Sequence, residues 1–551
     1  MFNPSSVCVY FASSFILAYY IYHHYQRRIR SKFPLPPGPK GLPLIGSLFK
    51  VMRDKSTKPR WRKYLDMGKT HISDIIYINV LGDRTIVLNS AAAVTEILER
   101  RSGIYSSRPP AYMLKDLSGR VASSMPLQAS NQFDCIKAGT GTLLTWITPM
   151  NGVSLWHRLH RKTFHQYFQP RVLPRYHPVQ RRLVFEFLNS LVNPSYDGCP
   201  AGYVRHYASS IILRVVYGIT SQEDRDHYVR LADRAVQGIV HTGNHGSFLV
   251  DYFPLLKHIP TWMPGATFKR QAKVWKHSAL ELRDAPWEKL AASNSIETAI
   301  PCFVTENIEK FSSDMHRMQE TIKNCAGMAY IAASDTSVSL ILTAILHLLH
   351  NPDVQSKAQQ ELDEVIGKAR LPDFGDREKL PYIEAIMIEA LRIHPVLPLS
   401  VPHYSIEDDV YQGYFIPKGT TVIGNAAAVL HDEIVYPEPY KFKPDRWMKQ
   451  EGKELPPSSL LYGFGYGRRE CPGKHFALDT VWLAIAGILS TCNITKAVDK
   501  DGQGIEAAID YVDGMLSHPK PFKCQFSLRE FESGAALGAL KSSLLCSDVK
   551  A

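Results

Sequence analysis

Hydrophobic and polar positions divide the chain into an apolar start, a long helical middle and two shorter regions of strand character. Apolar side chains recur at helical spacing through most of residues 91–390. Residues 72–90 predict a β-hairpin, and residues 413–423 return to strand character around a Pro-Lys-Gly-Thr turn. Residues 502–528 predict turns and short strands. We therefore expect a mainly α protein with a smaller β part, of the α+β class.

The apolar start predicts a membrane anchor. Residues 7–22 are almost wholly apolar and, extended to Tyr25, approach the ~20 residues that span a bilayer. A basic cluster follows at 26–32, and the positive-inside rule places such a cluster on the cytosolic side. A cleaved signal peptide would carry its charges before the apolar run, and a short amphipathic anchor would not be apolar all round. We predict a single transmembrane helix over 1–25, with the rest of the chain in the cytosol.

After this anchor we predict a hinge, one large domain and a tail. Residues 26–45 are basic and then rich in Pro and Gly, a composition that is stiff and cannot continue a helix. No Gly/Ser linker or repeat divides residues 46–530, which we interpret as one domain, and residues 531–551 as a flexible tail. Residues 121–142 have little periodicity and many small polar side chains, so we interpret them as an insertion.

Composition excludes several classes of function. The net charge is +12, but the Lys and Arg residues are scattered and form no nucleic-acid-binding signature, so we expect no nucleic-acid partner. A basic surface also suits an acidic protein partner or simple solubility. Nine cysteines with no C-x-x-C pair argue against a disulfide scaffold or a zinc site, and reduced thiols are typical of the cytosol.

The strongest chemical signal is the segment 464–473, Phe-Gly-Tyr-Gly-Arg-Arg-Glu-Cys-Pro-Gly. Gly467 and Gly473 allow tight turns where a Cβ would clash. The apolar spacing of residues 474–489 predicts that Cys471 lies at a helix N-terminus, where the dipole and free N–H groups favour a thiolate. A buried, inert thiol in a Cys-Pro-Gly turn is the alternative, but the full pattern is much more specific. A thiolate beside an aromatic ring and a cation is what a haem iron requires of a proximal ligand.

This pattern, F-x-x-G-x-R-x-C-x-G, resembles that of the cytochrome P450 family, and the resemblance extends over about residues 33–528. It implies the cytochrome P450 fold and the cofactor haem b (iron protoporphyrin IX). It makes Cys471 the axial ligand of the haem iron, with Phe464 and Arg469 in the cofactor site.

A second motif lies in a long apolar helix expected over 318–350. Asp335 and Thr336 stand in the run Ala-Ala-Ser-Asp-Thr-Ser, which resembles the oxygen-activation motif of the family with Ala333 in place of the usual glycine. A buried carboxylate is costly unless it is paired or hydrated, and a threonine there can donate to the carbonyl of Ala332. The resemblance implies that Asp335 and Thr336 deliver protons to bound dioxygen; a back-bonded core threonine is the alternative.

Three charged residues predict a structural cluster. Glu389 and Arg392 are three residues apart on a helix expected over 381–394, which places both side chains on one face. The segment Phe442–Trp447 resembles the second arginine motif of the family, so we expect Arg446 to join the pair and the cluster to brace the loop that holds Cys471. An exposed i,i+3 pair is the alternative.

The resemblance also implies residues for the haem propionates and for the substrate. Candidates for the propionates are Trp156, Arg469, His403 and either His160 or Arg161, an alternative that the sequence leaves open. The predicted substrate pocket is mostly apolar and comprises Ala332, Ala333, Leu399, Val401, Met515 and Leu516. For each of these residues, ordinary packing in the core is the alternative. Residues 248–265 are rich in aromatic residues and proline, which suits either core or contact with the membrane.

The activity implied by the resemblance is that of a haem-thiolate monooxygenase, which inserts one oxygen atom from O2 into a lipophilic small molecule. The expected partners are NADPH–cytochrome P450 reductase, which supplies NADPH electrons, and the endoplasmic reticulum membrane. Stretches such as Tyr105–Pro109 and Asp284–Trp287 look like the fungal O-methylsterigmatocystin oxidoreductase type, which suggests secondary metabolism. A haem-thiolate isomerase or dehydratase, and a non-catalytic haem-binding membrane protein, are the alternatives.

Overall fold

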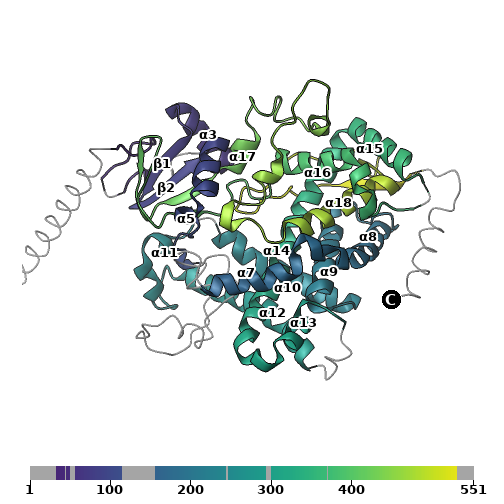
Figure 1. The fold of residues 1–551 in the computed structure, drawn as a ribbon, viewed down its shortest axis with the longest axis horizontal. Coiled ribbons are helices and arrows are strands. Elements are labelled where there is room, and N and C mark those ends of the chain that lie inside the picture. The colour runs from purple at the N-terminus through teal and green to yellow at the C-terminus, as the bar shows by residue number, and fades with distance from the viewer. Residues whose placement is uncertain are drawn as a thin grey trace, which may run out of the picture.

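A computed structural model describes residues 33–43, 45–49, 56–113, 155–243, 246–292, 300–368 and 370–529 (Figure 1). The predicted anchor over 1–25, the predicted insertion over 121–142 and the predicted tail over 531–551 lie outside the described residues. The described chain is mostly helical with a smaller β part, as the hydrophobic pattern predicts.

The main sheet has four strands in the order β1-β2-β6-β3. β1 and β2 form the predicted antiparallel hairpin, with Ile75 opposite Leu88, while β6 runs parallel to β2 and antiparallel to β3. Successive strand residues point to opposite faces, so Ile75 and Ile76 enter separate apolar clusters. The bounds are β1 Ile75–Val80, β2 Asp83–Leu88, β3 His403–Tyr404 and β6 Thr421–Gly424.

Two further strand pairs complete the β part. The predicted turn at 417–420 separates β5 from β6, but the two strands belong to different sheets, because β5 pairs with β4. β7 follows the last helix directly and pairs with β8 near the end of the described chain. The bounds are β4 Asp409–Tyr411, β5 Tyr414–Ile416, β7 Cys492–Lys496 and β8 Cys524–Leu528.

The helices fill the rest of the molecule, with the main sheet and α3 at one end and α8 and α15 at the other (Figure 1). The α-helices are α3 Arg60–His71, α4 Ala91–Val94, α5 Ser102–Tyr105, α7 Leu155–Phe168, α8 His177–Leu191, α9 Pro200–Tyr217, α10 Gln222–Thr242, α11 Leu249–Tyr252, α12 Thr267–Ala292, α13 Phe303–Lys310, α14 Met315–His350, α15 Pro352–Val365, α16 Pro381–Ile393, α17 Ala426–Leu430 and α18 Lys474–Thr491. Short turns of other helix types are η1 Thr95–Arg100, η4 Pro170–Tyr176, η5 Pro254–His258, η7 Ser312–Asp314, η8 Phe374–Lys379, η9 Pro444–Trp447, η10 Ser459–Leu461 and η11 Gly467–Arg469.

Helix α14 forms the centre of the helical core. It packs against α7, α9, α12, α16 and α18, and its apolar residues surround the helix because neighbours cover it on every side. Within the described residues it is the one helix long and apolar enough to cross a membrane, but 83% of its most apolar stretch is buried in protein. It is therefore a core helix, and it says nothing about the anchor predicted over 1–25.

The described part of the Pro/Gly-rich hinge is bound to the sheet. The amide of Tyr77 donates to the carbonyl of Pro37 at 2.9 Å, and the amide of Phe415 donates to that of Pro34 at 2.8 Å. A Cβ at Gly38 would lie 1.9 Å from the oxygen of Tyr77, so only glycine allows this close approach. The segment is thus fixed to the domain from residue 34 onward.

Candidate active site

A cavity of about 340 Å³ lies where α14 meets the segment that carries Cys471. Of the predicted pocket residues, Ala332, Ala333, Val401, Met515 and Leu516 line it. Its wall is mostly aliphatic and aromatic. Such a lining holds an apolar molecule by shape rather than by polar anchors.

Leu399 does not line this cavity, so its assignment to the substrate pocket is wrong. It packs instead on the sheet cluster that contains Ile76 and Val87. The chain turns at Ser400, whose φ of 55° is unusual for a residue with a side chain and whose amide donates to the carbonyl of Leu397 at 3.0 Å. The turn directs Leu397 and Val401 to the cavity and leaves Leu399 on the sheet side.

The loop before α18 presents Cys471 to the cavity. The amide of Cys471 donates to the carbonyl of Phe464 at 2.8 Å, which closes the loop. Gly467 has a φ of 50°, and a Cβ there would lie 2.8 Å from the oxygen of Leu98, as the sequence predicts. Gly473 has an ordinary backbone conformation and open space around it, so the predicted steric need for glycine at this position is wrong. Gly465, with a φ of 82°, is the second position in this loop that requires glycine.

The surroundings of Cys471 act in two directions on its thiol. The helix begins at Lys474 with Gly473 as its cap, so the cysteine lies just before the N-terminus. The N–H of Gly473 and the charges of Arg161 and Lys474 lower the pKa of the thiol, but its depth in the protein outweighs them and the pKa is raised. The sulfur is accessible from the cavity, yet the protein alone does not make it a thiolate. A bound metal ion is what deprotonates a coordinating thiol outright.

Three guanidinium groups surround the same end of the cavity, and no Asp or Glu accompanies them among the described lining residues. Arg108 donates to the carbonyls of Val401 and Pro402 at 2.8 Å, Arg469 to that of Ser106 at 2.7 Å, and Arg161 to that of Glu470 at 2.8 Å.

Burial and mutual proximity act on these cations. Burial, together with the nearby Arg469, lowers the pKa of Arg108 to about 9, and burial with the nearby Arg161 lowers that of Arg469 to about 10. The Nε of Arg108 is buried without a hydrogen-bond partner. Buried positive charge of this kind calls for an anionic ligand.

Arg108 is a residue that the sequence analysis did not assign to the site. It lies in the Tyr105–Pro109 stretch, which we used only for the subtype resemblance, and only the fold brings it to Arg469. The signal available in the sequence was an arginine beside two prolines, which has no spacing relation to Cys471.

Of the two alternatives His160 and Arg161, only Arg161 lines the cavity. His160 is buried between α7 and α14, where its Nε2 lies 3.4 Å from Nδ2 of Asn324, and it does not line the cavity. Consecutive helix residues point about 100° apart, so only one of the two can face the site. His403 does line the cavity; its Nδ1 lies 2.8 Å from the carbonyl oxygen of Tyr105, and burial beside Arg108 lowers its pKa well below the usual value. The side chain of Trp156 lies outside the described residues.

Thr336 and Asp335 point in different directions. Thr336 lines the cavity, and its hydroxyl donates to the carbonyl of Ala332 at 2.8 Å, the back-bonding that the sequence predicts. Asp335 is buried away from the cavity and accepts from Arg205 of α9 at 3.0 Å. Arg205 also donates to Asp233 of α10 at 2.8 Å, so the carboxylate is paired rather than placed beside the reacting atoms. Asp335 therefore does not line the cavity, and its part in proton delivery stays a prediction.

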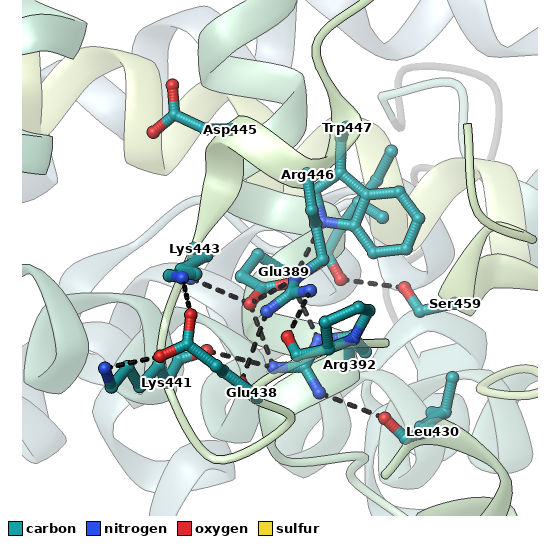
Figure 2. Close-up of polar contacts among 12 residues, drawn as sticks. Glu389, Arg392, Leu430, Glu438, Lys441, Lys443, Asp445, Arg446, Trp447 and Ser459 are labelled. Atoms are coloured by element: carbon teal, nitrogen blue, oxygen red, sulfur yellow. Dashed lines mark hydrogen bonds and ion pairs between the residues drawn. The ribbon is translucent and has the colours of Figure 1, made fainter. Parts of the chain in front are cut away.

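Glu389 accepts hydrogen bonds from both arginines predicted to join it (Figure 2). Arg392 donates through Nε and Nη2 at 2.8 and 2.9 Å, and Arg446 donates through Nε at 3.1 Å. The indole of Trp447 and the amide of Lys443 also donate to this carboxylate, at 3.0 and 2.8 Å. Glu389 and Arg392 have no exposed surface, so the alternative of an exposed pair is excluded.

The cluster connects α16 to the segments around it. Arg392 donates to the carbonyls of Leu430 and Lys441, and Arg446 to that of Pro437 (Figure 2). Ser459, on the way to the cysteine loop, donates to the carbonyl of Ile388 at 2.7 Å. The cluster therefore fixes the long segment 430–447 on α16 before the chain reaches Cys471.

Comparison with known proteins agrees with this geometry. The family model described as Cytochrome P450 matches residues 144–526. Cytochrome P450 monooxygenase 98 of Postia placenta is 36% identical over 94% of this chain and 95% of its own length. A cytochrome P450 monooxygenase of Armillaria gallica is 37% identical over 90% of this chain and 92% of its own length. Tryptamine 4-monooxygenase of Psilocybe cyanescens is 34% identical over 94% and 97%.

Proposed function

Because the chain belongs to the cytochrome P450 family, we propose that it is a haem-thiolate monooxygenase that inserts one oxygen atom from O2 into a lipophilic small molecule. The observation that carries the proposal is one cavity lined by the Cys471 thiol, by buried arginines and by the aliphatic face of α14. The O-methylsterigmatocystin oxidoreductase type, and a role in fungal secondary metabolism, remain part of the proposal.

The residues around the cavity fit haem b. A haem carries two propionates, and buried Arg108 and half-buried Arg161 and Arg469 supply positive charge to a cavity whose described lining contains no Asp or Glu. Cys471 supplies a thiol on the same cavity as the proximal ligand, with Phe464 beside it. When bound, the haem supplies the activation of dioxygen, and the thiolate favours cleavage of the O–O bond.

If Arg108 holds a propionate, Arg108→Met should weaken haem retention. The loss of a charge-assisted hydrogen bond in a buried site predicts a rate of haem loss about 10- to 100-fold higher. Transfer of haem from the protein to excess apomyoglobin measures that rate. Arg100→Met is the matched control, because the Arg100 side chain is 74% exposed and pairs only with Glu96 among the described contacts. Equal rates in the wild type and Arg108→Met would contradict the assignment.

Thr336 is the residue of the predicted proton-delivery pair that reaches the cavity. Its hydrogen is committed to the carbonyl of Ala332, so its oxygen is left to accept a hydrogen bond from water or from a protonated oxygen of the reaction. Asp335 does not line the cavity but accepts a hydrogen bond from Arg205, which also donates to Asp233 near the surface. We propose that its effect on proton delivery is indirect. Burial, and then the charge of Asp335, raise the pKa of Asp233, although Arg205 lowers it.

We expect Thr336→Ala to lower product formation about 100-fold, the scale on which a positioned proton-transfer group acts. The carbon monoxide difference spectrum should stay normal, because the change touches neither Cys471 nor the arginines. Thr321→Ala is the matched control: it lies on the same helix and is buried, but it does not line the cavity. An unchanged rate of product formation in Thr336→Ala would remove this residue from the mechanism.

The lining favours a neutral substrate. Outside the arginine end, the polar lining side chains are hydroxyl groups such as those of Thr336 and Ser337, and the described lining contains no carboxylate to bind an amine cation. A charged amine such as tryptamine, which gives one relative its name, lacks a counter-charge among these residues. We therefore propose a lipophilic, uncharged substrate.

We further propose that the domain is held at the endoplasmic reticulum membrane by the predicted anchor and by residues 248–265. Five large apolar side chains of this segment are exposed: Leu249, Phe253, Leu255, Trp262 and Met263 are 65, 47, 82, 77 and 36% exposed. Val250 is buried, with Phe248 and Leu256 packed beside it, so part of the segment belongs to the core. Exposed apolar side chains gathered in one short segment mark a contact with lipid or protein.

Electron supply tests the proposed activity. The reduced wild-type protein should give the thiolate-type Soret band with carbon monoxide, and turnover should require NADPH and NADPH–cytochrome P450 reductase. An isomerase or dehydratase would turn over without NADPH, and a non-catalytic haem protein would consume no oxygen with any reductase. A protein without the thiolate-type band would contradict the proposal at its foundation.

A further inference from the structure

The turn that carries Met515 and Leu516 into the cavity is followed by a buried serine. Ser517 is only 2% exposed. Serine is usually exposed, because burial of its small polar side chain brings no hydrophobic stabilisation. The turn itself is tight, since a Cβ at Gly514 would lie 3.1 Å from the carbonyl oxygen of Leu516. The turn belongs to no regular strand, and its base is closed by the amide of Val512, which donates to the carbonyl of His518 at 3.0 Å.

Ser517 makes four hydrogen bonds that reach three parts of the molecule. Its amide donates to the carbonyl of Val396 at 2.9 Å, in the other loop that lines the cavity. Its carbonyl accepts from the hydroxyl of Ser339 at 2.6 Å, on α14. Its hydroxyl donates to the carbonyl of Val512 at 2.7 Å and lies 2.7 Å from Nε2 of His394, at the end of α16.

His394 is itself held in one orientation. Its ring stacks on that of Tyr511, with centroids 3.4 Å apart and planes 14° apart, and the hydroxyl of Tyr511 lies 3.1 Å from Nε2 of His347 on α14. Burial lowers the pKa of His394 well below its usual value, so the ring is neutral. Since the hydroxyl of Ser517 donates to Val512, Nε2 of His394 must carry the hydrogen and donate to Ser517.

These contacts join the turn to the catalytic helix. Ser339 lies three residues after Thr336 on α14, which places the two on one face of the helix. The distance of Met515 and Leu516 from Thr336 is thus set through Ser517 rather than by apolar packing alone, because apolar contacts are not directional. Buried hydrogen bonds fix such a register because a shifted turn would leave donors and acceptors unpaired.

We infer that Ser517, held by His394 and Ser339, is a positioning residue that fixes Met515 and Leu516 over the reacting end of the cavity and so determines which substrate shapes bind there. This inference rests on the proposed function, since it names a specificity determinant of the same site. Ser517 touches no reacting atom and acts only through the turn.

The test compares a large azole with a small one. Without the two hydrogen bonds of its hydroxyl group, the turn of Ser517→Ala is less ordered in the free protein. Binding of a large ligand must then order the turn, and the free energy of this ordering should raise the Kd of clotrimazole about tenfold. Imidazole is too small to need the turn, so its Kd should change by less than about twofold. Both constants come from the Soret shift of the ferric protein. Ser356→Ala is the matched control, because Ser356 is exposed on α15 and bonds only to Pro352.

Hydrogen exchange gives a readout that does not depend on the cofactor. Backbone amides of residues 512–517 should exchange about tenfold faster in Ser517→Ala, while those of α14 keep their protection. Ser339→Ala removes the donor to the carbonyl of Ser517 and replaces serine by a stronger helix former. It should produce a smaller increase in the exchange rates of the same amides. This variant tests the inference if Ser517→Ala takes up no haem.

Three results would overturn the inference. In the first, clotrimazole affinity and exchange over 512–517 match the wild type. In the second, imidazole is weakened as much as clotrimazole, which would indicate a general loss of structure. In the third, the wild type gives no thiolate-type band, so that the proposed function fails first. A normal wild-type spectrum with an unaffected Ser517→Ala variant would contradict the inference alone.

Discussion

Replacement of Cys471 by serine is expected to abolish the thiolate-type Soret band and to lower monooxygenation more than about 1,000-fold, the scale on which loss of a reacting group is felt. The expectation follows from the geometry of the loop. The amide of Cys471 is tied to the carbonyl of Phe464, so residue 471 keeps its place on the cavity whichever side chain it carries. A serine hydroxyl is a far weaker ligand and electron donor than a thiolate.

The measurement is the carbon monoxide difference spectrum of the reduced variant beside the wild type, followed by NADPH-dependent turnover. Cys302→Ser is the matched control, because Cys302 is buried and bonds to Thr305, where a serine hydroxyl can serve equally. The control should keep both the band and the activity. A Cys471→Ser protein that retained the thiolate-type band would show that another cysteine holds the iron.

Replacement of Glu389 by glutamine is expected to destabilise the fold by about 3–5 kcal/mol, because it leaves two buried guanidinium groups without their counter-charge. Arg392 has no exposed surface, and the Arg446 side chain is 8% exposed, so neither cation can turn to water for compensation. The amide of Lys443 and the indole of Trp447 lose a charged acceptor in the same step. Part of the yield should be recovered without haem, since this cluster fixes the segment that leads to Cys471.

Urea denaturation followed by circular dichroism measures this effect as a lower midpoint. Glu384→Gln is the matched control on the same helix: Glu384 pairs with Arg377, and the two side chains are 28 and 24% exposed. A partly hydrated pair of this kind contributes about 1 kcal/mol or less. A loss of stability in Glu389→Gln no greater than in the control would contradict the structural role of the cluster.

Local patterns in the sequence predicted the parts of the site that depend on nearby residues. Gly467 shapes the loop before Cys471, and the i,i+3 spacing of Glu389 and Arg392 places both on one face of α16. The back-bond of Thr336 is also a property of a single helix turn. Each of these features needs only a few consecutive residues to be correct.

The parts that the sequence missed depend on how distant elements pack. Arg108 reaches the cavity from a stretch with no motif, and Asp335 turns away because Arg205 of α9 attracts it. His160 lies on the wrong face of α7 by one residue, and Leu399 is directed to the sheet by the turn at Ser400. Hydrophobic periodicity predicts that a helix or strand exists. It does not predict which of its side chains face a neighbouring element that is distant in the sequence.

The attachment of residues 34–38 to the sheet sets how far the domain can swing from the bilayer. If the chain leaves the membrane at residue 25, only residues 26–33 connect the lipid to Pro34, the first residue bound to the domain. Eight residues extend at most about 28 Å, less than the width of the domain. If the proposed anchor holds, a domain tethered this closely would keep the exposed Trp262 near the lipid. A lipophilic substrate dissolved in the bilayer would then reach the protein at a much higher concentration than in the cytosol.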